Sequence, residues 1–161
     1  MNPYASYLAD KNPSEVIAAT PGKLAAILNA LSSAQADRAP APGKWSIREI
    51  LCHLADCELV FAFRIRQTVA EPDHVIQPFD QDHWARTYSP YTAQEALETF
   101  TGVRKWNLTL IRSLPSEAFS RAVTHPERGA MTLLTVIETM GGHDINHMEQ
   151  VEAIVTCAAT A

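Results

Sequence analysis

Residues 46–70, SIREILCHLADCELVFAFRIRQTVA, are the stretch that decides how the rest of the chain must fold. Ser46, followed three residues later by Glu49, forms a capping box, a pattern with which helices begin. Apolar residues then recur every three or four positions and share one face of a helix. They are Ile47, Ile50, Leu51, Leu54, Phe61 and Ile65. The stretch therefore predicts a long helix that buries this face and ends near Ala70.

Three further segments have the same helical period. The first covers about residues 13–31 and contains Pro21, which we expect to kink or split the helix. The next opens with a second capping box and covers residues 92–114, where a proline follows it. The last covers about residues 132–157, with a threonine cap at its first position. These segments complete a set of four long helices.

The irregular segments between these helices restrict the topology. Residues 32–44 are a polar linker, and residues 71–91 contain three prolines and several aromatic residues without a clear period. A connector of that length favours a crossover along the whole domain over a tight turn between antiparallel neighbours. Residues 115–131 form another irregular segment. We therefore predict an all-α fold, a single-domain four-helix bundle over residues 1–161 with a long crossover between helices two and three.

Composition and charge exclude several functional classes. The 161-residue chain has a formal net charge of −5 and no cluster of Lys or Arg, so nothing supports nucleic-acid binding. It begins without a signal-peptide pattern and has no apolar run of about 18 residues, so we expect a cytoplasmic protein that does not enter a membrane. Three irregularly spaced cysteines do not make a disulfide framework. Motifs for nucleotide binding and serine hydrolysis are also missing.

Residues 141–150, GGHDINHMEQ, place two glycines and two histidines in the last helix. His143 and His147 are four residues apart, so their rings project from consecutive turns on one side and can bind one divalent metal ion. His53, at the flank of the apolar face of the second helix, can supply a third ring. Three imidazoles would leave coordination positions open for water or substrate, as in catalytic sites. The spacing alone also fits ordinary histidines at the edge of a core.

Two segments carry a resemblance to a known family. KWSIREILCHLADCE (residues 44–58), with Arg64 after it, and GGHDINHMEQ resemble the DinB-like family, which includes the YfiT-type proteins. The likeness extends through the opening PSEVIAATPGKLAAIL and through FDQDHWA at residues 79–85. It implies a four-helix bundle with a crossover, in which one histidine of the second helix and two of the fourth hold a divalent metal ion.

This resemblance implies that His53, His143 and His147 are the metal ligands. Cys57, four residues after His53, could reach the metal as a thiolate, although the family pattern does not call for it. Imidazole ligands suit zinc and nickel, which we expect first, and also iron and copper. The two glycines before His143 either let a chain segment or a substrate approach the metal or only permit close helix packing.

Three charged residues lie on faces that should be buried. Glu58, Arg104 and Asp144 interrupt the apolar faces of the second, third and fourth helices. Because an unpaired buried charge is costly, we expect Arg104 to meet Glu58 or Asp144, with the other carboxylate accepting a hydrogen bond from a ligand histidine. A rotation of the helices could instead bring these groups to the solvent edge. Gln150, three residues after His147, is expected to lie near the metal as a hydrogen-bond partner of a ligand rather than as a ligand itself.

The resemblance also implies a chemistry, since family members of known activity are similar to metal-dependent thiol transferases or isomerases. We therefore expect a thiol S-transferase that acts on a small-molecule substrate with a low-molecular-weight thiol as co-substrate. A hydrolase using metal-bound hydroxide and a metal-binding stress protein without turnover are the alternatives. No catalytic side chain is assigned; His83 and Trp84 are candidates for the mouth of the site. A homodimer could form through an exposed helix face.

Overall fold

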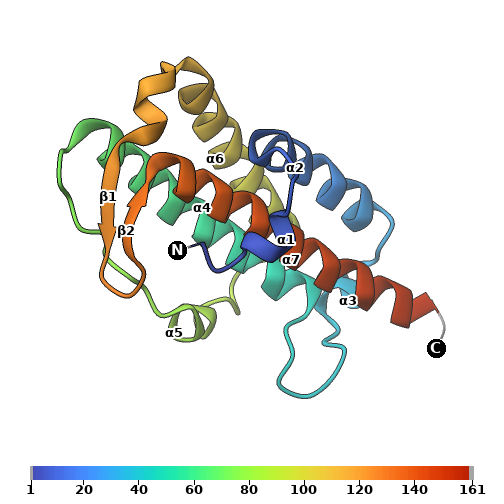
Figure 1. Ribbon diagram of the computed structural model, residues 1–161. Coiled ribbons are helices and arrows are strands. Elements are labelled where there is room, and N and C mark those ends of the chain that lie inside the picture. Colours follow the sequence, from blue (N-terminus) through green and yellow to red (C-terminus); the bar gives the residue numbers. More distant parts are fainter. Residues whose placement is uncertain (1, 160–161) are drawn as a thin grey trace.

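Four long helices within the described residues 2–159 of the computed structural model pack as a bundle (Figure 1). Side chains are described as far as residue 157. The bundle helices are α2 (Pro13–Asn29), α4 (Ile47–Ala70), α6 (Ala93–Ser113) and α7 (Leu133–Ala159). The shorter elements are α1 (Ala5–Leu8), α3 (Ser33–Asp37), α5 (Gln81–Ala85), the 3₁₀ helix η1 (Ser116–Ser120), and the strands β1 (Ala122–His125) and β2 (Gly129–Thr132).

Side-chain caps explain where the bundle helices begin. The hydroxyl of Ser46 accepts from the amide of Glu49 at 3.2 Å, and the carboxylate of Glu49 accepts from the amide of Ser46 at 2.8 Å. The same reciprocal box opens α6, and Thr132 Oγ1 accepts from the amide of Thr135 at the start of α7. Each cap satisfies amide groups that a helix leaves unpaired. The predicted starts of these three helices are confirmed.

The predicted crossover connects α4 to α6. Residues 71–92 run from the end of α4 back along the bundle through α5, so α4 and α6 point the same way (Figure 1). Helices α6 and α7 each pack against both α2 and α4, which closes the bundle. A tight hairpin would have made α4 and α6 antiparallel, so the long connector sets which of their residues face each other.

Pro21 lies inside α2 without dividing it, so the split that the sequence suggested is absent from this helix. Proline has no amide hydrogen, and the carbonyl of Ile17, four residues earlier, therefore loses its usual partner within the helix. Arg104 of α6 takes that place, because its Nη1 donates to the carbonyl oxygen of Ile17 at 2.7 Å. The proline thereby provides an acceptor for a charged side chain in the core.

The connectors contain more regular structure than the sequence predicted. The polar linker includes α3, and the segment before α7 includes a hairpin in which Val123 pairs with Met131, so the all-α expectation becomes a mostly helical fold. Alternate residues of β1 are buried, and Gly129 has a φ of +77°, where glycine is favoured. The alternation in β1 and the glycine at position 129 were the sequence features that could have indicated the hairpin. Strands of four residues are too short for periodicity to separate them from a loop.

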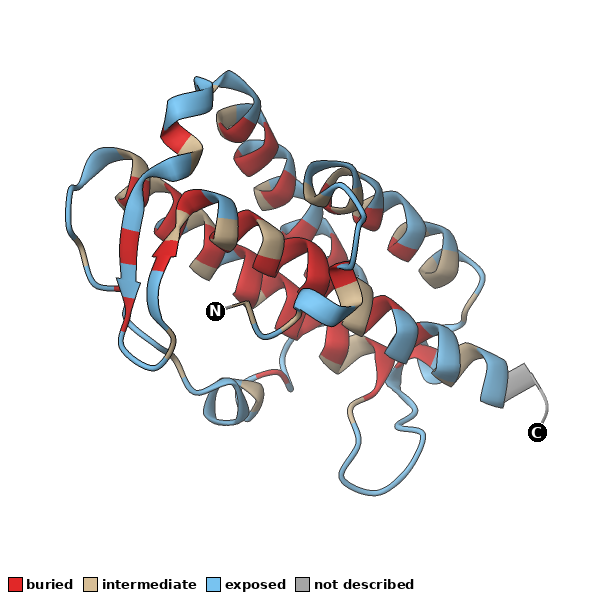
Figure 2. Cartoon of the chain, in the orientation of Figure 1, coloured by how far each residue is buried: buried red, intermediate tan, exposed pale blue. Residues whose placement is uncertain are grey.

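Buried residues lie along the inner faces of the bundle helices (Figure 2). They form two apolar clusters, one that includes Ile17, Phe61 and Met140 and another that includes Leu24 and Phe100. On α6 and α7 buried polar residues lie between the two clusters along the sequence, Arg104 on α6 and His143, Asp144 and His147 on α7. In the described part of the chain, no helix is long and apolar enough to span a membrane.

Candidate metal centre

The rings of His53 on α4 and of His143 and His147 on α7 converge where these two helices pack. The ring centroids are 5.1 Å apart for His53 and His143, 4.7 Å for His53 and His147, and 4.5 Å for His143 and His147. The Nε2 atoms of His53 and His143 are 3.0 Å apart. All three side chains are buried. The structure thus brings together the three residues that the sequence singled out, and their role as ligands stays a prediction.

The spacing of the ring nitrogens fits a shared cation. Nitrogen ligands that lie about 2.0–2.1 Å from zinc in tetrahedral geometry are roughly 3.3 Å from one another. The 3.0 Å between the Nε2 atoms of His53 and His143 is close to that value. A hydrogen shared between these two nitrogens would also explain the distance, but it would leave the adjacent ring of His147 unexplained. The nitrogens of His53 and His143 therefore fit a divalent metal ion, and the ring of His147 lies beside them, 4.7 and 4.5 Å from theirs between centroids.

Burial keeps the three imidazoles neutral. It lowers the pKa of His53 to about 3, with a smaller contribution from the neighbouring His147. Burial, followed by repulsion from the other two rings, holds the pKa of His143 well below its ordinary value. Burial also lowers the pKa of His147, against the opposing effect of its hydrogen bond with Gln150. Neutral rings offer the lone pairs that a metal ion requires at neutral pH.

Gln150 and Trp45 orient the rings from outside. The Oε1 atom of Gln150 lies 3.1 Å from Nδ1 of His147, which places the hydrogen on Nδ1 and the lone pair on Nε2. The indole of Trp45 packs against His53 with centroids 4.9 Å apart and lies nearly parallel to His147 at 6.5 Å. Gln150 was expected near the site. Sequence reasoning missed Trp45, whose signal is its position directly before the cap of the helix that carries His53.

Cys57 is a further donor beside the rings. Its Sγ is 3.5 Å from Nε2 of His53, and one donor atom each from His53, Cys57 and His143 all lie within 4.8 Å of one another. Burial raises the pKa of the Cys57 thiol, which is therefore protonated at neutral pH when no cation is near. The thiol is within reach of the same position as the histidines, although the family resemblance did not call for it.

Gly141 and Gly142 let the N-terminal segment lie directly on α7. A Cβ at Gly141 would be 3.1 Å from Leu8 Cδ1, and one at Gly142 would be 2.7 Å from Tyr4 Cβ and would collide with the carbonyl oxygen of Tyr4. The ring of Tyr4 meets that of His143 edge-on, with centroids 5.2 Å apart. Gly141 thus permits close packing, and Gly142 permits the approach of another chain segment. Each of the two explanations offered for the glycine pair therefore applies to one of the glycines.

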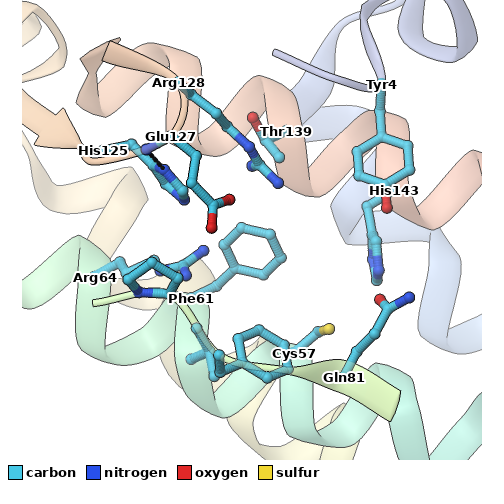
Figure 3. Close-up of a pocket in the computed structure, with 13 residues that line it drawn as sticks. Tyr4, Cys57, Phe61, Arg64, Gln81, His125, Glu127, Arg128, Thr139 and His143 are labelled. Atoms are coloured by element: carbon cyan, nitrogen blue, oxygen red, sulfur yellow. Dashed lines mark hydrogen bonds between the residues drawn. The ribbon is translucent and has the colours of Figure 1, made fainter. Parts of the chain in front are cut away.

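Two cavities flank the three rings. One, of about 350 Å³, reaches His143 and Cys57 (Figure 3). The other, of about 630 Å³, reaches His147. Tyr4 and Gln81 line both cavities, so the position predicted to be reactive lies between them.

The crossover contributes Gln81 to these cavities rather than the two neighbours that the sequence suggested. His83 and Trp84 are not among the described residues that line either cavity. His83 is exposed, with its Nδ1 3.4 Å from Asp80 Oδ2, and Trp84 packs against Phe79 with centroids 4.8 Å apart. Both follow Gln81 in the five-residue helix α5, so a small rotation of this helix decides which of its residues face the site.

Arg104, Glu58 and Asp144 form a buried ion cluster that shares helices with the rings. Arg104 donates from Nη1 to Asp144 Oδ2 at 2.6 Å and from Nη2 to Asp144 Oδ1 at 3.0 Å, and its Nη2 is 2.8 Å from Glu58 Oε2. Asn107 Nδ2 donates to Glu58 Oε1 at 2.6 Å. The expectation that one carboxylate would bond a ligand histidine is corrected for the described residues, because one guanidinium has enough donors to hold both carboxylates.

A solved structure shares the fold of this chain. The structure of YfiT from Bacillus subtilis, described as a probable metal-dependent hydrolase with an unusual four-helix bundle topology, matches with a TM-score of 0.84. The match covers 91% of this chain and 86% of YfiT at 21% sequence identity, which shows a common fold.

Sequence comparison points to the same group. YfiT is 24% identical over 143 residues, covering 85% of this chain and 79% of YfiT, and is named a candidate metal-dependent hydrolase. A protein of Oceanobacillus iheyensis with the same description is 26% identical over 125 residues, covering 77% of this chain and 73% of that protein. The sequence model of the DinB superfamily matches residues 17–151. That range contains all three clustered histidines and most of the chain, and this protein therefore belongs to the DinB superfamily.

Proposed function

We propose that this protein is a metal-dependent enzyme in which His53, His143 and His147 hold a divalent metal ion between two cavities. The convergence of three buried, neutral rings from two helices on one position is the observation that carries the proposal. When bound, such an ion supplies Lewis-acid activation, which lowers the pKa of a small nucleophile toward neutrality.

The surrounding side chains hold and shield this position. Trp45 packs on the ring of His53, and Tyr4 packs on that of His143, so both limit the access of bulk water. Gln150 keeps the hydrogen of His147 on Nδ1. Because three imidazoles carry no charge of their own, they leave the full positive charge of a bound ion available to a substrate.

Hydrolysis of a small molecule is the first reaction that we propose. The relatives from Bacillus subtilis and Oceanobacillus iheyensis are named as candidate metal-dependent hydrolases. In this reaction water is the nucleophile, and the site needs to hold one organic substrate. Either cavity, at about 350 or 630 Å³, is in the size range of small-molecule sites.

Thiol S-transfer to an electrophile is the second candidate, and the presence of two cavities favours it. A low-molecular-weight thiol and an electrophile could each occupy one cavity, and the two cavities meet at Tyr4 and Gln81. The thiol would release its proton to water, its sulfur would form the new C–S bond, and the leaving group would depart with its electron pair. A hydrolase has no evident need for the second cavity.

Elemental analysis of the purified protein tests the metal centre. We expect about one zinc, nickel or iron ion per chain, and at least roughly tenfold less in His53→Ala and in His147→Ala, because two imidazoles hold such ions far more weakly than three. His83→Ala removes an exposed histidine and should leave the content unchanged. Cys57→Ser should also keep the ion. A full metal content in His53→Ala would refute the site.

Activity assays of the metal-loaded protein then separate the two reactions. Turnover of an ester or amide panel that disappears in His53→Ala would support hydrolysis. Turnover of an electrophile panel only in the presence of low-molecular-weight thiols would support S-transfer. A fully metallated protein that turns over neither panel would contradict both and favour a metal-binding protein without catalysis.

A further inference from the structure

The cavity beside His143 has a cationic end that the proposed chemistry does not use. Arg64 of α4 and, from the hairpin, His125 and Arg128 line this end (Figure 3). The side chain of Arg64 is 9% exposed, and its Nη2 donates to the carbonyl oxygen of Gln77 at 3.3 Å. Its Nε is buried and has no hydrogen-bond partner among the described residues. Because buried donors are almost always paired, a guanidinium in this state beside a cavity indicates a missing acceptor.

Neighbouring charges favour an anion at this end. Burial and then repulsion from Arg128 lower the pKa of Arg64, and burial followed by the charges of Arg128 and Arg64 lowers that of His125. His125 Nδ1 accepts from the amide of Glu127 at 3.2 Å, so the neutral ring keeps its hydrogen on Nε2 as a donor. Two guanidinium groups and an N–H donor therefore gather around one space.

Glu127 is the single carboxylate among the described residues that line this cavity. It is exposed, and Figure 3 shows its carboxylate turned toward the space between Arg64, His125 and Arg128. An exposed side chain on a turn can move at little cost, so a ligand with a stronger or better placed negative charge can displace it. Arg64 and Arg128 outnumber it, which leaves this end of the cavity net positive.

We propose that this end is a subsite for the carboxylate or phosphate of a small organic anion. Arg64 lies seven residues after Cys57, two turns along the same face of α4 and about 10 Å along its axis. Phe61 lies between these ends on α4, Phe79 also lines the cavity, and both provide apolar contact. The substrate class is thus an anion with a short apolar segment between its charged group and its reacting group. The location of the reacting group at the metal rests on the proposed function, whereas the anion subsite does not.

Isothermal titration calorimetry of the metal-loaded protein tests the subsite with three probes. Phenylacetate presents a carboxylate on a short apolar group, inorganic phosphate presents the other anion, and phenylacetamide has the shape of phenylacetate without its charge. We expect saturable binding of phenylacetate or phosphate, and the stronger of the two identifies the preferred group. Phenylacetamide should bind at least roughly tenfold more weakly than phenylacetate if the carboxylate is preferred.

Variants assign the binding to particular residues. Arg64→Met should weaken the preferred anion by roughly tenfold or more, while Arg112→Met, which removes an exposed arginine of α6 outside the cavity, should leave the affinity unchanged. Glu127→Gln should tighten binding severalfold, because it removes the competing carboxylate. Glu127 is exposed, so this variant should fold even if Arg64→Met melts at a lower temperature.

Several results would overturn the subsite. They are the absence of binding by both anions, equal affinity in Arg64→Met and the unchanged protein, and unchanged or weaker binding in Glu127→Gln. Titration of metal-depleted His53→Ala separates this proposal from the metal centre, since anion binding that depends on Arg64 should persist there. Binding that requires the metal ion and is indifferent to Arg64 would mean that the anion binds the metal, and it would overturn the subsite as well.

Discussion

Two polar clusters lie side by side in the core of this bundle, and they differ in what completes them. In the ion cluster, Arg104 lies at hydrogen-bonding distance of both Glu58 and Asp144 and supplies their positive charge. In the histidine cluster, made of His53, His143 and His147, neutral rings face one another. Among the described residues, no charged side chain bonds the two nitrogens that meet, Nε2 of His53 and Nε2 of His143. The chain itself supplies the opposite charges of the first cluster, whereas the second fits an added metal ion. Burial of polar groups therefore stabilises the fold in one place and prepares a binding site in the other.

The largest effect that separates the clusters is expected from Arg104→Met. This change leaves two carboxylates buried without their cation and should lower the free energy of unfolding by about 3–5 kcal/mol. Urea denaturation measures the loss. The metal content of the folded protein should stay unchanged, because among the described residues neither carboxylate bonds a ring of the histidine cluster.

Arg112→Met is the matched control for this change, since it removes an exposed arginine from the same helix and should shift stability by less than about 0.5 kcal/mol. If Arg104→Met kept full stability, the ion cluster would have no structural role. If it lost its metal in proportion to its stability, the two clusters would form one unit and the contrast between them would fail.

The pH dependence of the metal-free protein should reveal the neutral state of the histidine cluster. The pKa of each ring lies below its unfolded value of about 6.5, so the unfolded chain binds more protons as the pH falls. The stability that the neutral rings contribute is therefore fully present above the unfolded pKa and declines as the pH falls below it. For His53 this decline continues down to its folded pKa of about 3. The decline should be about 1.4 kcal/mol per pH unit for each ring that remains neutral.

Urea midpoints of chelator-treated protein, measured between about pH 7 and pH 5, check this slope. This pH range lies in the window that the lowered histidine pKa values define. His53→Phe keeps an aromatic ring without a titrating group and should reduce the slope. A flat profile in the unchanged protein, or one that His53→Phe does not alter, would argue that the rings are protonated or exposed before the chain unfolds.

A smaller effect is expected at the edge of the histidine cluster, where Gln150 bonds His147. Gln150→Leu removes the acceptor that keeps the hydrogen on Nδ1, and loss of such a partner typically weakens metal affinity by about 10–100-fold. Competition with a coloured chelator measures the change. Gln94→Leu, at an exposed glutamine of α6, is the control. Unchanged affinity in Gln150→Leu would mean that packing alone orients the ring.

The sequence predicted the long elements and the histidine cluster for identifiable physical reasons. Capping boxes and apolar faces that extend over five or more turns specify where α4 and α6 lie, and i, i+4 spacing places His143 and His147 together whatever the rest of the bundle does. Short elements such as α3 and the hairpin gave too few residues for a period to emerge.

The contacts that complete each cluster depend on how the elements are placed in space, which local pattern does not encode. Asn107 reaches Glu58 only because the crossover makes α4 and α6 parallel. Tyr4 reaches His143 only because the N-terminal segment folds back on α7, and the glycine pair indicated that something approaches without identifying it. The preference for an anion that we propose near Arg64 likewise depends on the hairpin, which brings Arg128 close to Arg64.

The smallest expected effect tests whether the hydrogen bond between Arg104 of the ion cluster and the backbone of α2 contributes to stability. Replacing proline by alanine inside a helix normally stabilises the helix by about 3 kcal/mol, because the lost amide hydrogen bond is restored. In Pro21→Ala the new amide would compete with Arg104 for the carbonyl of Ile17. We therefore expect the free energy of unfolding, measured by urea denaturation, to rise by less than about 1 kcal/mol. The restored helix hydrogen bond is offset because the buried guanidinium of Arg104 loses or strains its own bond to the carbonyl of Ile17. Thr20→Ala would show the helix response without this competition, because among the described residues the hydroxyl of Thr20 bonds the carbonyl of Val16 and not that of Ile17. A gain near the full value in Pro21→Ala would mean that the hydrogen bond from Arg104 to Ile17 adds nothing to the stability of the ion cluster, whose carboxylates would then hold the guanidinium unaided.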